Sequence, residues 1–162
     1  MSLDMNVELI NKVSAFLWAE ADMLDHREYQ SWLKLWTEKG HYIVPTDRET
    51  TDYAATLNLA YDDHAMREMR IARLENGESV SAADATVTVR MVSRVRILDA
   101  GSDRILARCA TTINELRHGN LITYPADVEF TLVPDGDSFL MEQKVVKLLH
   151  AEGYLRTVSF IF

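Results

Sequence analysis

Hydrophobic residues recur in steps of three and four along the first part of the chain. Between residues 7 and 24 they fall on one side of a helix with 3.6 residues per turn, which predicts an amphipathic helix. Asp25 and His26 interrupt this apolar stripe. A second, short helix is predicted over about residues 27–37, because four large side chains share one side there by the same spacing: Tyr29, Trp32, Leu33 and Trp36.

Three further segments complete the first half of the chain. The segment HYIVP predicts a short strand that ends at Pro45, since proline has no amide proton to give to a strand ladder. Residues 46–60 are mixed and polar, which predicts a loop. A third helix is expected to begin at Asp62 or Asp63, either of which can cap its free amides, and to end at Gly77. The first half is therefore predicted to be mainly helical.

The second half of the chain changes to a period of two. Alternating runs rich in β-branched residues are separated by short polar breaks that contain glycine, which is typical of strands joined by tight turns. A long antiparallel meander after a helical half defines an α+β domain, and 162 residues fit a single domain over residues 1–162. The predicted strands are residues 86–98, 104–116, 121–132, 139–149 and 154–162.

Composition and charge restrict the function. Hydrophobic residues make up 48% of the chain and charged residues 26%, so a packed core is expected. The formal net charge of −8 argues against a broad surface for nucleic acid or anionic lipid, which needs clustered lysine and arginine. No apolar run approaches the roughly 20 residues that span a bilayer, and the first residues are acidic where a signal peptide is basic. We therefore expect a cytoplasmic protein.

Metal, thiol and phosphate chemistry find little support in the sequence. Cys109 is the single cysteine, so this chain alone forms no disulfide and supplies too few thiolates for an iron–sulfur cluster. It lies in a strand-like run and is expected to be a small buried apolar residue. The five histidines show no spacing typical of a metal site, and the scattered glycines form no phosphate loop. No cofactor or metal site is expected on this chain.

An acid–base pocket is the catalytic arrangement that the residues still allow. Asp25, His26, Tyr29, His41 and Tyr42 could converge where the helices meet the mouth of the sheet, and such a group could move protons. In the alternative interpretation Asp25 caps the second helix, His26 lies on the surface, and Tyr42 is an ordinary aromatic residue of a strand. The sequence leaves both interpretations open.

Two tryptophans and three arginines also have two interpretations. Trp32 and Trp36 either pack in the core between helix and sheet, which we expect, or form the apolar wall of such a pocket. Arg90, Arg94 and Arg96 have even numbers in one predicted strand, so they share a face if no bulge interrupts it. That face is either solvated or a protein interface, where arginine is enriched. The opposite face would carry Val87, Val89, Met91, Val95 and Ile97.

Two strings in the first half carry a family resemblance. FLWAEADMLDHREYQSWLKLWTEKGHYIVP resembles the opening of the small (β) subunits of aromatic-ring-hydroxylating dioxygenases, and YDDHAMREMRIARL resembles their next signature, two aspartates before a helix with R-x-x-R-L. Two features depart from the family pattern: those subunits usually have Pro-Ser-Arg before the first long strand and an asparagine within it, whereas the corresponding stretch here is ADATVTVRMVSRV, with Arg94 in place of the asparagine. The matching positions are Glu20, Ala21, Leu24, Asp25, Tyr29, Trp32, Leu33, Leu35, Tyr42, Val44 and Pro45 in the first string and Asp62, Asp63, Arg70, Arg73 and Leu74 in the second.

The resemblance implies a cystatin-like α+β fold, the cone of the nuclear transport factor 2-like and SnoaL-like proteins, in which helices wrap a curved antiparallel sheet. It implies a large (α) subunit as partner, which carries a Rieske iron–sulfur cluster and a mononuclear iron, in a three-plus-three hexamer with a trimer of this chain. This chain would then be mainly structural, in aromatic compound catabolism, without catalytic residues of its own. The alternative on the same fold is a stand-alone SnoaL-like isomerase, dehydratase or cyclase that uses the five acid–base residues above.

Overall fold

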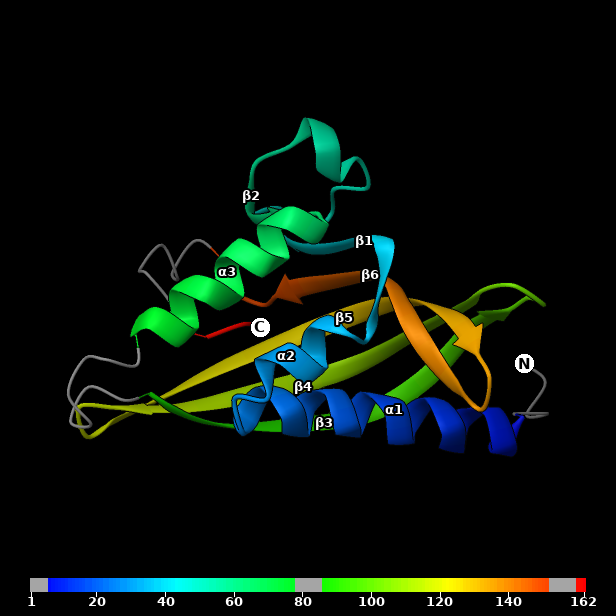
Figure 1. The fold of residues 1–162 in the computed structure, drawn as a ribbon, viewed down its shortest axis with the longest axis horizontal. Coiled ribbons are helices and arrows are strands. Elements are labelled where there is room, and N and C mark those ends of the chain that lie inside the picture. The colour runs from blue at the N-terminus through cyan, green and yellow to red at the C-terminus, as the bar shows by residue number, and fades with distance from the viewer. Residues whose placement is uncertain (1–5, 78–85, 152–159) are drawn as a thin grey trace.

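The structure, a computed structural model, describes residues 6–77, 86–151 and 160–162, and in these the helices come first and a long sheet follows (Figure 1). The helices are α1 (Val7–Asp25), α2 (Tyr29–Leu33) and α3 (His64–Asn76), with a 3-10 turn η1 (Tyr53–Ala55). The strands are β1 (Trp36–Pro45), β2 (Asn58–Asp62), β3 (Val87–Ala100), β4 (Ile105–Arg117), β5 (Asn120–Asp135) and β6 (Ser138–Leu148).

The strands form one sheet in the order β2-β1-β6-β5-β4-β3. Neighbouring strands run antiparallel, except for β1 and β6, which run parallel. Helix α1 packs along the edge strand β3, and α3 packs against β1 and β2 near the opposite edge. Figure 1 shows α1 and α2 in front of the long strands of this sheet. The predicted α+β cone, with helices on a largely antiparallel meander, is confirmed.

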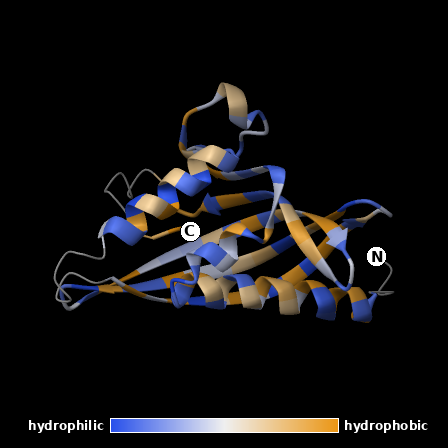
Figure 2. Ribbon diagram, in the orientation of Figure 1, coloured by the Kyte–Doolittle hydropathy of each residue, from blue (hydrophilic) through white to orange (hydrophobic). Residues whose placement is uncertain are grey.

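The core lies between the helices and one face of the sheet. Polar and apolar segments alternate along α1 (Figure 2), as its predicted stripe requires; the stripe is buried from Val13 to Leu24, whereas Val7 and Trp18 are exposed. Cys109 is buried in β4, which confirms its assignment as a small core residue. Alternate residues of β4 and β5 meet across the ladder and point into this core: Ile105 with Leu132, Ala107 with Phe130, and Cys109 with Val128.

Three boundaries differ from the prediction. Helix α2 ends at Leu33 and Trp36 begins β1, because the amide of Met141 in β6 already donates to the carbonyl of Leu35, 2.7 Å away. Sheet pairing thus overrides the helical spacing of the side chains. Residues 46–60, predicted as a loop, contain η1 and the start of β2, a strand too short to show a period. Of the predicted last strand, residues 152–159 lie outside the described residues, and 160–162 are not in the sheet.

A bulge in β3 separates the three arginines that were expected on one face. The register with β4 shifts around Arg94, which has a left-handed φ of 54°. An extra residue in a strand reverses the alternation of its side chains. Arg90 therefore faces the core with its side chain 5% exposed, whereas Arg96 is exposed. Val89 and Val95, also expected together, lie apart, the first exposed and the second packed against the core.

Candidate functional site

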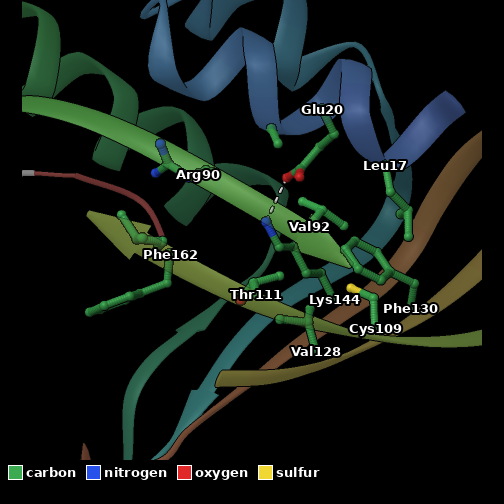
Figure 3. A pocket seen from close by; sticks show the side chains of 12 residues that line it. Leu17, Glu20, Arg90, Val92, Cys109, Thr111, Val128, Phe130, Lys144 and Phe162 are labelled. Atoms are coloured by element: carbon green, nitrogen blue, oxygen red, sulfur yellow. Dashed lines mark hydrogen bonds and ion pairs between the residues drawn. The ribbon is translucent and has the colours of Figure 1, made fainter. Parts of the chain in front are cut away.

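A small cavity lies inside the cone, between α1 and the sheet (Figure 3). Its volume is about 20 Å³, which is room for about one water molecule. Pockets for small organic molecules are typically about 300–1,000 Å³. Leu17, Val92, Cys109, Val128 and Phe130 form its apolar walls. Among the described residues, this cavity therefore has no room for an organic ligand.

A buried ion pair lies at this cavity. The ammonium of Lys144 in β6 is 2.6 Å from Oε1 of Glu20 in α1, and both side chains are 4% exposed. The indole N–H of Trp32 donates to the same oxygen at 2.9 Å. Burial lowers the pKa of Lys144, and the neighbouring Glu20 opposes this effect. The pair joins α1, α2 and β6, and its polar atoms are used in that contact.

The sequence interpretation did not single out Glu20 and Lys144 as an interior pair. A signal was present for Glu20, which falls on the apolar stripe of α1 between Leu17 and Leu24, where a charged residue needs a buried partner. No comparable signal in the sequence identifies Lys144 as that partner, because the pairing depends on how β6 lies beneath α1.

Asp25 has a role that neither sequence interpretation anticipated. Its carboxylate accepts hydrogen bonds from Oγ1 of Thr88 at 2.9 Å and from the backbone amide of Arg90 at 2.8 Å. It also forms an ion pair with the guanidinium of Arg90. It does not cap α2, whose N-cap is Glu28 and has no side-chain hydrogen bond. Asp25 thus ties the end of α1 to the edge strand β3.

The other four residues of the expected acid–base group do not converge. Tyr29 and Tyr42 are buried, and the hydroxyl of Tyr42 accepts a hydrogen bond of 2.9 Å from the backbone amide of Phe162. Burial raises the pKa of Tyr42 above its usual range. His26 is exposed beside Asp22, and His41 stacks on Tyr61, 5.3 Å between ring centroids. His41 precedes Tyr42 in β1, so it points to the opposite face of the sheet.

The two tryptophans lie in the core and do not line the cavity. Trp32 packs edge-to-face on Trp36, 5.4 Å between ring centroids, and on Tyr42 at 6.3 Å. The guanidinium of Arg67 lies 4.3 Å from the ring centroid of Trp36, a cation–π contact. The expected core position of both tryptophans agrees with these contacts.

The aspartates of the second signature are structural. Asp62 is buried and pairs with Arg70, with Nε to Oδ2 at 2.5 Å and Nη2 to Oδ1 at 3.0 Å. Asp63 caps α3 by accepting from the amide of Met66 at 2.9 Å, as predicted. Arg67, which the sequence interpretation missed, is buried and donates to the carbonyls of Gly40, Asp62 and Thr37. These residues fasten α3 to β1 and β2.

Part of the sheet surface that points away from the core carries no charged side chain. This part lies at the start of β3, the end of β4 and the start of β5. Met91 is 62% exposed and Leu121 is 70% exposed, although soluble proteins rarely leave contiguous apolar areas uncovered. Asp127 borders this area and pairs with Arg94 and with Arg48. We call it the uncharged face; it consists of Val87, Val89 and Met91 in β3, Thr112, Asn114 and Leu116 in β4, and Leu121, Thr123 and Pro125 in β5, which are cross-strand neighbours.

Two further properties of the described residues bear on the kind of site. Among residues 6–77, 86–151 and 160–162, no group of three or more histidine, cysteine, aspartate or glutamate side chains could hold a metal ion. Within the same ranges, no helix has both the length and the apolar character needed to cross a membrane.

Known proteins resemble the chain in sequence and fold. The small oxygenase component of the p-cumate 2,3-dioxygenase system of Pseudomonas putida is 28% identical over 137 residues, 83% of this chain and 76% of that protein. The benzoate 1,2-dioxygenase beta subunit of Burkholderia mallei has the same fold, with 20% identity and a TM-score of 0.78 over 99% of this chain and 100% of that one. A chain of naphthalene 1,2-dioxygenase has a TM-score of 0.81 at 15% identity, over 99% and 89%. The family described as "Ring hydroxylating beta subunit" matches residues 19–152, so the chain belongs to the beta subunits of ring-hydroxylating dioxygenases.

Proposed function

We propose that this chain is the structural small subunit of a Rieske-type aromatic-ring dioxygenase, and that it assembles with a large catalytic subunit and with copies of itself. The complex adds both atoms of dioxygen to an aromatic ring, with electrons that pass from NADH through a reductase. The Rieske cluster and the mononuclear iron belong to the large subunit. The observation that carries this proposal is the contrast between a closed interior and an uncharged, exposed outer face.

The interior argues against chemistry on this chain. A general acid or base must lie within hydrogen-bond reach of a substrate atom. The cavity of about 20 Å³ has no room for a substrate ring. The carboxylate of Asp25 is occupied by Thr88 and Arg90, and that of Glu20 by Lys144 and Trp32. These groups support the fold, so the chain contributes rigid geometry to the complex.

The uncharged face supports assembly. The centre of a protein interface is depleted in charged residues, and its polar rim surrounds it. The uncharged face fits this pattern, with Arg94 and Asp127 on its border. Of the three arginines considered as interface residues, Arg94 and Arg96 are exposed and available to a partner, while Arg90 is used inside the cone. We therefore assign Arg94 and Arg96, with the uncharged face, to the interface.

The test is co-expression of the tagged chain with its large subunit, followed by purification and analysis of iron and sulfide. We expect a larger partner in about equal amount that carries both. Met91→Glu places a charge in the uncharged face and should abolish co-purification. Met69→Glu in α3 is the matched control, since Met69 is 64% and Met91 62% exposed, and it should leave co-purification intact. A clean homo-oligomer without iron, with turnover by the isolated chain, would instead favour the SnoaL-like enzyme.

A further inference from the structure

Arg96 in β3 and Arg108 in β4 lie directly opposite each other in the sheet. Arg108 points away from the core, because its neighbours Ala107 and Cys109 are buried in it. Arg96 points to the same side, since residues that face each other across a ladder share one face of the sheet. Like charges in this position repel each other. The two arginines are therefore unfavourably placed in the isolated chain.

The carboxylates nearest to this arginine pair already have other partners. Glu129 is the neighbour of Arg108 in β5, but its Oε1 lies 3.1 Å from the ammonium of Lys147. Asp127, on the same face of β5, pairs with two other arginines. In the part of the chain that the structure describes, no ion pair or hydrogen bond reaches the guanidinium of Arg96 or of Arg108. Arg96 is exposed and Arg108 is half-buried, so a partner can reach both.

The arginine pair adjoins the uncharged face. In β4, Thr112 belongs to the uncharged face, and Ala110 and Arg108 follow it on the same side of the sheet in steps of two residues. The bulge at Arg94 brings Arg96 to this side, because without the extra residue the alternation of β3 would turn Arg96 toward the core. An uncharged centre with arginine on its border has the composition of a protein interface.

The charge of the pair selects the group that binds it. The chain as a whole has a net charge of −8, so two guanidiniums without a carboxylate are a local exception. Arginine binds carboxylates through two parallel N–H donors, and it is the preferred residue for ion pairs at interfaces. A second copy of this chain that docks by the same surface in a two-fold arrangement would bring the same arginines. An acidic side chain of the large subunit is the complementary group.

We propose that Arg96 and Arg108 form a clamp that binds an aspartate or glutamate side chain of the large subunit. The carboxylate of the partner lies between the two guanidiniums and offsets their repulsion, which it can do only in the complex. The clamp thus lowers the stability of the isolated chain and raises the stability of the complex. The inference rests on the proposed function, because it names the contact that the large subunit makes beside the uncharged face.

The first experiment uses the complex that co-purifies with the tagged, full-length chain, and measures how fast the immobilised chain loses the large subunit at about 0.15 M NaCl. In Arg96→Gln/Arg108→Gln we expect this loss to be about tenfold faster than in wild type. Lys34→Gln/Arg73→Gln is the matched control, since it removes two exposed cations beside and within α2 and α3, and its rate should equal that of wild type. The urea midpoint of the isolated Arg96→Gln/Arg108→Gln chain should be no lower than that of wild type.

The second experiment identifies the carboxylate. Arg96→Lys/Arg108→Lys keeps both charges and supplies amines that a carbodiimide joins to a carboxylate in direct contact. We expect mass spectrometry of the complex to show position 96 or 108 linked to an aspartate or glutamate of the large subunit. Links to Asp99 or Glu129 within the chain form in the isolated chain as well, so the isolated chain supplies the baseline.

Two results would overturn the proposal. One is an Arg96→Gln/Arg108→Gln complex that loses the large subunit no faster than the Lys34→Gln/Arg73→Gln complex. The other is a set of cross-links from positions 96 and 108 that reach only this chain or another copy of it. Both results leave the proposed function intact, because the wild-type chain still holds its large subunit. A wild-type chain that retains no large subunit contradicts the proposed function, and the clamp with it.

Discussion

The inner and outer faces of the sheet each depart from the usual distribution of charge, because the apolar core encloses ion pairs and part of the outer face lacks charge. The inner face holds two ion pairs: Glu20 with Lys144, both 4% exposed, and Asp25 with Arg90, 13% and 5% exposed. The outer face of β3, β4 and β5 exposes Val89 and other uncharged residues to the surface. Soluble chains normally bury apolar residues and expose charged ones. Under the proposed function, the inner charges fix positions in the fold and a partner covers the uncharged face.

The inner charges have a cost that only their partners offset. Taking an ion from water into a protein interior costs several kcal/mol, and the attraction to a well-placed partner roughly cancels this cost. Removal of one partner leaves the other charge buried and alone. Substitutions inside the cone should therefore affect stability strongly, and substitutions on the outer face should affect assembly.

The largest effect is expected from Lys144→Met, which leaves the carboxylate of Glu20 buried without its cation. We expect the free energy of unfolding to fall by about 3–5 kcal/mol, measured by urea denaturation. The double variant Glu20→Gln/Lys144→Met should recover most of this loss, because no isolated charge remains. Lys12→Met is the control, since Lys12 pairs with Glu8 on the surface of α1, and it should leave the urea midpoint unchanged. A small loss for Lys144→Met alone would show that the interior is more hydrated than the closed cavity indicates.

Asp25→Asn tests whether Asp25 contributes to stability or to catalysis. The amide keeps an acceptor for Thr88 but loses the ion pair with the buried guanidinium of Arg90. We expect the free energy of unfolding to fall by roughly 2–3 kcal/mol, with turnover per assembled complex unchanged. Both quantities should be measured on the same preparation, by urea denaturation and by oxygen uptake. Loss of turnover in a stable, assembled complex would place Asp25 in the chemistry.

Arg94→Asn tests the border between the two faces. Arg94 has a φ of 54°, a left-handed conformation that asparagine adopts more readily than arginine. The Arg94 side chain, which pairs with Asp127, is 62% exposed. In the variant, Asp127 keeps the guanidinium of Arg48 as a partner, 3.2 Å away. Exposed pairs contribute about 0–1 kcal/mol, so relief of the backbone should raise the free energy of unfolding by roughly 0.5 kcal/mol. A decrease in thermal denaturation midpoint would show that the pair outweighs the conformational preference.

The same position shows where sequence patterns succeed and where they fail. The stripe of α1 and the alternation in β4 and β5 are set by burial of one face, so their periods predict those elements directly. The bulge at Arg94 has no counterpart in the period, and it reverses the faces of Arg90 and Arg96. The family's usual asparagine would have been a signal for a left-handed residue there, and arginine in its place removed it.

The interior site was less predictable than the fold. Glu20 on an apolar stripe signals a buried partner, but a contact between residues 20 and 144 depends on the finished sheet. Trp36 has the spacing of a helix residue and lies in β1, since the ladder with β6 decides its conformation. Ile161 and Phe162 contact Arg90 and Tyr42 through backbone atoms, and the sequence gives no signal for such contacts.

The smallest effect is expected at His26, which the acid–base interpretation places in a pocket and the structure places on the surface, 66% exposed. The carbonyl and the carboxylate of Asp22 raise the pKa of His26. A raised pKa in the folded state gives a stabilising contribution that is present below the unfolded pKa and lost as the pH rises through the folded one. The urea midpoints of His26→Asn and wild type should therefore coincide at about pH 8.5, and any deficit of the variant should be confined to about pH 5. Turnover of the complex should be unchanged at both pH values, because a side chain on the outer surface of the cone reaches no substrate inside the cone. A loss of turnover would mean that the chemistry occurs at the mouth of the cone and not in the large subunit.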